Sequence, residues 1–345
     1  MSPGPVPSVY REAGLTCKNS RGRMVSPLYL FRHNRCTGKA HYRLPTMSAL
    51  SGIRNALSTI NFRLFSLYLA IVLIIPAIST IIEYMVTVSP GLRSSLQVDM
   101  QNFHIYQLFT SSFVHLNFDQ YLGNVTAYLL IAVYGLVLAT LVNRKRLYLV
   151  ISKIIVVIFL IFGASFAIFN ATTTYYVGLS GIDSALAGLL LLFWLLYLEH
   201  TSQQRMRHYY GLVLSCILAL SAGIIARYIL LYHAERNALL LTLLAVVILL
   251  CALAIILYRQ QFFDLYRVLV GFSWSSRLIT LAIVAIFAYF IWNLFPERLA
   301  NSTRTVSISL HLAGIVIGIL AGYLFLMYLE QIAYFNGEKE VISRQ

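Results

Sequence analysis

Three groups of polar side chains interrupt the long apolar runs of this sequence, and the first contains a serine that could act as a nucleophile. Ser180 lies in the segment Gly178-Leu179-Ser180-Gly181. Flanking glycines allow other backbone to approach the hydroxyl, and unpaired N–H groups at a helix start can stabilise an oxyanion. On its own, Gly-x-Ser-Gly in a membrane helix is more typical of close helix packing.

The second group is a histidine on a helical face made of glycines. His311 shares this face, within about 60°, with three following residues: Gly314, Gly318 and Gly322. A comparable small-residue face follows Ser180: Ser184, Ala187 and Gly188. Such faces let two helices approach closely, so we expect Ser180 Oγ and His311 within hydrogen-bond distance, as a nucleophile and its base require. The alternative is a histidine that only packs or bridges helices.

The third group could supply hydrogen bonds to a developing oxyanion. Gln120 and Asn124 are one helical turn apart and can direct two amide donors toward one point. His115 precedes them, and we expect it to order the loop before this helix rather than to take part in chemistry. The alternative is a set of interfacial polar residues.

The elements that position these residues must be membrane helices. Of 345 residues, 59% are hydrophobic and only 11% are charged, whereas a soluble domain has about 25% charged residues. Hydropathy predicts eight spans, and these are centred on Leu73, Ala132, Val157, Leu190, Leu218, Val247, Ile286 and Leu320.

The net charge of +14 is explained by its distribution along the chain. Residues 1–63 carry ten Lys or Arg against one acid and form a basic arm. With both termini in the cytoplasm, 21 basic residues fall on the cytoplasmic side of the membrane and five on the outer side, as the positive-inside rule requires. Anionic lipid is the expected partner of the arm, and nucleic acid is not needed.

This topology predicts a basic arm over 1–63, a transmembrane domain over 64–329 and a short cytoplasmic tail over 330–345. It makes the fourth and eighth spans run in the same direction, so that Ser180 and His311 share the outer half of the membrane. The cell membrane is the expected location. The Arg-rich start also fits a mitochondrial inner-membrane protein, and residues 1–46 could precede a start at Met47.

Taken together, the three groups resemble the rhomboid family of intramembrane serine proteases. The resemblance rests on His115 and Asn124, on residues 178–181, and on His311 with Gly314 and Gly318. It implies an all-α polytopic fold, a rhomboid-like helical bundle with a six-helix core plus two extra helices. It also implies that Ser180 and His311 hydrolyse peptide bonds of transmembrane proteins, without a metal or cofactor.

The resemblance further implies an oxyanion site formed by the Ser180 backbone N–H and the Asn124 side chain, with Gln120 and Gly178 beside it. Gly181, His115, Gly314 and Gly318 would have structural roles near this site.

Three departures from the family pattern accompany this resemblance. Gln120 replaces a second histidine of the oxyanion region, Ser184 replaces an aromatic residue that packs on the base, and three helices rather than one separate serine from histidine. Asp183, also at membrane depth, could orient the base, but helix-start capping or contact with a wet cavity is preferred.

Two other functions fit the same sequence. A catalytically inactive rhomboid-like protein would bind membrane helices for quality control or trafficking, and a transporter would also use eight spans. For the protease, the loop 295–305 and the loop before His115 are the expected gates for substrate entry.

Overall fold

The computed structural model describes residues 62–99, 102–115, 117–168, 175–176, 178–202, 210–231, 238–293 and 308–342. Within α7 and α14 the side chains are described only as far as Ile161 and Tyr328. The predicted basic arm over 1–63 therefore lies almost entirely outside the described residues, as does the predicted gate over 295–305.

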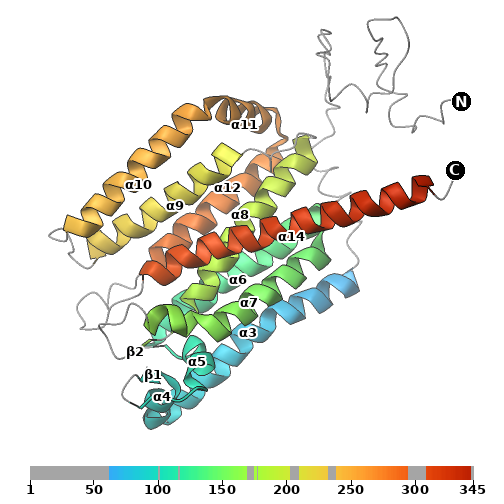
Figure 1. Ribbon diagram of the computed structural model, residues 1–345. Coiled ribbons are helices and arrows are strands. Elements are labelled where there is room, and N and C mark those ends of the chain that lie inside the picture. Colours follow the sequence, from blue (N-terminus) through green and yellow to red (C-terminus); the bar gives the residue numbers. More distant parts are fainter. Residues whose placement is uncertain are drawn as a thin grey trace, which may run out of the picture. The chain divides into compact units, whose positions relative to one another are not determined.

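The described chain is almost entirely helical (Figure 1). Seven of its helices are long and apolar enough to cross a membrane, which indicates a multi-pass membrane protein. They are α3 (Phe62–Val88), α6 (Phe118–Leu141), α8 (Ser180–Ser202), α9 (Tyr210–Leu231), α10 (Ala238–Leu257), α12 (Trp274–Asn293) and α14 (Ile308–Ile342).

The third predicted span, centred on Val157, coincides with α7 (Lys145–Ile168). This 24-residue helix is not among the seven, and its described side chains end at Ile161. At the other end of the chain, α14 continues through Ile342, so most of the segment predicted as a tail is helical.

Helix α8 is the centre of the bundle. It packs against α6, α7, α12 and α14, and 94% of its most apolar stretch is buried, against 11% for α10. Helix α10 packs mainly on α9, so most of its apolar surface is left to contact lipid. Figure 1 shows α10 at the edge of the bundle and α8 in its middle.

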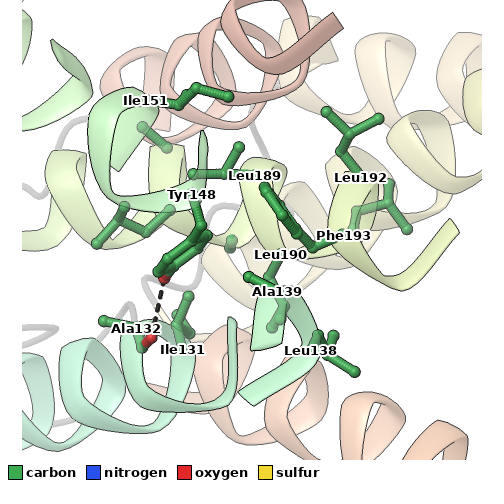
Figure 2. Packing of buried hydrophobic residues seen from close by; sticks show 14 of the residues in the cluster. Ile131, Ala132, Leu138, Ala139, Tyr148, Ile151, Leu189, Leu190, Leu192 and Phe193 are labelled. Carbon is green, nitrogen blue, oxygen red and sulfur yellow. Dashed lines mark hydrogen bonds between the residues drawn. The ribbon is translucent and has the colours of Figure 1, made fainter. Parts of the chain in front are cut away.

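The core between α6, α7 and α8 is organised around a buried tyrosine (Figure 2). The Tyr148 hydroxyl donates a hydrogen bond to the carbonyl oxygen of Ala132 at 2.9 Å, and its ring meets Phe193 edge-on, with centroids 5.1 Å apart. A Cβ atom at Gly135 would lie 2.6 Å from the Tyr148 hydroxyl. A glycine is therefore required there, and the hydroxyl is satisfied inside an apolar core.

Helices α6 and α7 are joined by a tight turn. Asn143 has a φ of 54°, a left-handed conformation that asparagine tolerates better than most residues. The Arg144 N–H bonds to Ala139 O, and the Asn143 N–H bonds to Thr140 O, which together form a Schellman motif. The chain reverses within a few residues, so α7 runs back along α6.

The segment between α3 and α6 contains short elements, which are α4 (Pro90–Leu96), β1 (Val98–Asp99), α5 (Gln107–Thr110) and the 3-10 helix η2 (Ser111–Phe113). β1 pairs antiparallel with β2 (Tyr175–Tyr176), and the Gly178 N–H bonds to Ser111 O at 2.9 Å. These contacts hold the segment against the start of α8.

One further helix, α11 (Arg259–Gly271), connects α10 to α12. It is amphipathic and exposes Phe263, Tyr266 and Val270. Such a helix between two spans is typical of a membrane interface.

Candidate active site

Helices α8 and α14 pack in parallel through their small residues. Gly181 lies against Leu310, Gly188 against Ile315 and Ile319, and Gly322 against Leu189 and Leu192, so the contacts advance along both helices together. A Cβ atom at Gly188 would overlap Ile315 O, and one at Gly318 would overlap Ala185 O. The predicted close approach of the small-residue faces of α8 and α14 is confirmed. It brings His311 to the first turn of α8.

His311 is fully buried, and its hydrogen bonds determine its tautomer. The Ser184 hydroxyl donates to Ser180 O at 2.7 Å, and its Oγ lies 3.1 Å from His311 Nδ1. A carbonyl oxygen can only accept and a hydroxyl has one proton, so both contacts are hydrogen bonds only when Oγ accepts from Nδ1. On this ground we assign the proton of the neutral imidazole to Nδ1 and the lone pair to Nε2.

Ser180 is the first residue of α8 and is only 5% exposed. His311 interacts with its backbone, while the recorded side-chain hydrogen bond of His311 goes to Ser184. The Ser180–His311 dyad thus stays a prediction. The structure adds Ser184 as the hydroxyl in direct contact with the imidazole.

Gly178 brings the first and third groups of residues together. Its φ is 110°, a conformation that strongly favours glycine. A Cβ atom there would lie 3.1 Å from Asn124 Nδ2, 3.3 Å from Gln120 Nε2 and 3.6 Å from the His115 ring. The two amide groups therefore face the backbone two residues before Ser180.

Asn124 presents a donor suited to an oxyanion. Its side chain is buried, and among the described residues Nδ2 has no hydrogen-bond partner. An unsatisfied buried donor is costly in most settings, but a site that stabilises a developing negative charge requires a donor of this kind.

A buried glutamate anchors the loop before α6. Glu83, at the end of α3, pairs with Arg93 at 3.0 Å, accepts from the His115 N–H at 3.3 Å and lies 3.5 Å from His115 Nδ1. Burial lowers the pKa of His115 below its ordinary value of 6.5, while the neighbouring Glu83 opposes this shift. These contacts fit the predicted role of His115 in ordering the loop.

Asp183 does not contact His311 through any recorded hydrogen bond. It is buried, its Oδ1 has no hydrogen-bond partner among the described residues, and Tyr128 on α6 is its electrostatic neighbour. The side chain in hydrogen-bond contact with the imidazole is that of Ser184.

Sequence reasoning missed the contact made by Ser184 and the anchoring residues Glu83 and Arg93. The signal for Glu83 was present, since an acid near the end of an apolar span needs a partner. In the described part of the chain, no cluster of three or more His, Cys, Asp or Glu side chains is placed to hold a metal ion.

Comparison with known proteins gives no family, since no family model, curated protein or solved structure matches this chain.

Proposed function

We propose that this protein is an intramembrane serine endopeptidase of the rhomboid type, acting on transmembrane proteins. The observation that supports it is that two distant segments contact the stretch from Gly178 to Ser184 at the start of α8. His311 meets the first turn of α8, and the Asn124 amide faces the backbone of Gly178.

In the proposed mechanism Ser180 attacks the scissile carbonyl carbon. His311 Nε2 removes the hydroxyl proton and gives it to the leaving amine, while Nδ1–H stays bonded to Ser184. Water then attacks the acyl-enzyme, Nε2 takes the water proton and returns it to Ser180 Oγ, and the new carboxyl end of the substrate is released. The Ser180 N–H and Asn124 Nδ2 donate to the oxyanion of the tetrahedral intermediate. No metal or cofactor is needed for these steps.

Substrate and water must reach a buried serine, so the site has to open. Helices α6 and α12 meet near it, where a Cβ atom at Gly123 would lie 3.6 Å from Asn293 Oδ1. We assign lateral substrate entry to this seam. The cell membrane is the proposed location, and the predicted charge bias would place both termini on its cytoplasmic side.

The test is cleavage of a single-span substrate by the purified protein, together with labelling by a serine-directed fluorophosphonate. Ser180→Ala should abolish both, and His311→Ala should abolish cleavage. Ser202→Ala is the control, because it removes a serine hydroxyl at the other end of the same helix, where it donates to the carbonyl of Leu198. It should leave cleavage and labelling intact.

Retained cleavage in Ser180→Ala or His311→Ala would overturn the dyad. A folded wild-type protein that binds membrane helices but neither cleaves nor labels would support the inactive rhomboid-like alternative instead.

A further inference from the structure

A cleft of about 490 Å³ lies at the end of the bundle opposite the candidate active site. It is formed by the start of α3, the α6–α7 turn and α14, which contributes Phe325. Phe325 follows His311 by 14 residues, which places it about 21 Å further along the helix axis. The cleft is therefore separate from the site of Ser180 and His311.

The polar side of the cleft carries three consecutive cations. Arg144, Lys145 and Arg146 all line it, and none of its lining residues is acidic. The structure records no ion pair for these three side chains with any described residue. The left-handed turn at Asn143 places them at the start of α7, where the first backbone N–H groups lack partners within the helix and also favour an anion.

The other side of the cleft is apolar. Leu64, Leu147, Val150 and Phe325 come from three different helices and line the same space. Cationic and apolar groups thus line the same cleft, and this cleft lies beside membrane-spanning helices. A ligand that satisfies both sides has an anionic head and a hydrocarbon body.

We propose that this cleft binds an anionic phospholipid, with its phosphate on residues 144–146 and its acyl chains along Leu64 and Phe325. Basic pockets between membrane helices on the cytoplasmic side commonly hold such headgroups. The basic arm of residues 1–63 does not suit this cleft, because its ten cations against one acid would be repelled. A soluble phosphate would leave the apolar side unused.

The experiment measures binding of phosphatidylglycerol and phosphatidylcholine to the full chain in neutral detergent by native mass spectrometry. Phosphatidylglycerol should be retained preferentially. Combined Arg144→Gln, Lys145→Gln and Arg146→Gln should weaken its binding by about 100-fold, since each cation near a membrane surface contributes a several-fold factor. The melting temperature in lipid-free detergent should stay unchanged, because these side chains have no recorded partners to lose.

The control removes the same charge elsewhere, through Arg259→Gln, Arg267→Gln and Arg277→Gln, and should leave this affinity as it is. Equal binding of the two lipids, or equal losses in the two triple variants, would overturn the proposal. Glycerol 1-phosphate serves as a soluble probe. If it competes as well as phosphatidylglycerol does, the site is one for small anions and the lipid assignment is wrong. Phe325→Gln should weaken lipid binding but not that of glycerol 1-phosphate.

Discussion

At the scale of single residues, we infer that Ser184 determines which nitrogen of His311 carries the proton. Its hydroxyl proton goes to Ser180 O, so its Oγ can only accept from Nδ1. Ser184→Ala removes this acceptor. We expect the turnover number to fall about tenfold, the loss that one hydrogen bond of about 1.4 kcal/mol would produce, while the Michaelis constant for the substrate stays unchanged.

The Ser184 prediction has a readout that does not depend on proteolysis. Nitrogen-15 NMR of labelled histidine should place the His311 proton on Nδ1 in the wild type and a mixture of tautomers in Ser184→Ala. Ser215→Ala is the matched control, since Ser215 is also buried and donates to the carbonyl four residues earlier, that of Gly211. An unchanged His311 spectrum in Ser184→Ala would refute the assignment.

Two asparagines of the same segment should behave in opposite ways. Asn124 Nδ2 has no described partner, so Asn124→Ala should leave the melting temperature unchanged while the turnover number falls about 10²- to 10³-fold, as on loss of an oxyanion donor. Asn117 caps α6 by accepting from the Gln120 N–H at 2.8 Å, so Asn117→Ala should cost about 1 kcal/mol of stability and keep activity. The reverse pattern would remove Asn124 from the proposed site.

The sequence predicts which helices meet at the candidate site, but it does not predict which side chains are hydrogen-bonded there. The 3.6-residue period places His311 on the glycine face, and small residues permit close approach, so the meeting of α8 and α14 follows from composition. Ser180 and Ser184 lie one turn apart, about 6 Å along the axis. Which of the two serines contacts His311 depends on how far α14 is shifted along the axis of α8. The packing of side chains such as Leu310 determines this shift.

At the scale of elements, the contact between α8 and α14 depends on glycine. A Cβ atom at Gly318 would overlap Ala185 O, which is backbone and cannot rotate away. Gly318→Ala should therefore force the helices apart and destabilise the protein by about 1–3 kcal/mol, the usual cost of overpacking. Because His311 is on the same helix face, proteolytic activity should fall with stability.

Gly223→Ala in α9 is the control for this substitution. Its new Cβ would lie 3.1 Å from Ile291 Cδ1, the flexible tip of a side chain. Thermal unfolding in detergent should show a much smaller change than for Gly318→Ala. Equal changes in the two variants would mean that α8 and α14 do not depend on close backbone approach.

The long apolar helices were predictable from sequence, whereas the connecting elements were not. Helix α11 contains Arg259, Asp264 and Arg267, so hydropathy treats it as a loop even though one face is apolar. The β1–β2 pair has only two residues in each strand. Pairs this short are determined by how the flanking helices bring the two segments together.

At the scale of the whole molecule, the number of spans follows from how the helix ends are arranged. Gln120 and Asn124 near the start of α6 face Gly178, which precedes α8, so α6 and α8 start at the same end of the bundle. The α6–α7 turn reverses the chain at the other end. α7 must therefore run the full length of the bundle. Its 24 residues extend about 36 Å, enough for a hydrocarbon core of about 30 Å.

This arrangement predicts that α7 is an eighth span and that both termini lie on the same side of the membrane. Seven spans would place the two termini on opposite sides of the membrane. Adding a tag at each end and testing in sealed vesicles which tag a protease removes therefore distinguishes seven spans from eight. Single cysteines at Asn143, before α7, and at Asn170, after it in the sequence, should react with an impermeant thiol reagent from opposite sides, in a background where Cys17, Cys36, Cys216 and Cys251 are replaced by serine. Tags on opposite sides, or labelling of both cysteines from one side, would make α7 a helix that does not cross. The parallel packing of α8 and α14 requires an odd number of crossings between them, and α9, α10 and α12 supply three, so the choice between seven and eight spans depends on α7 alone.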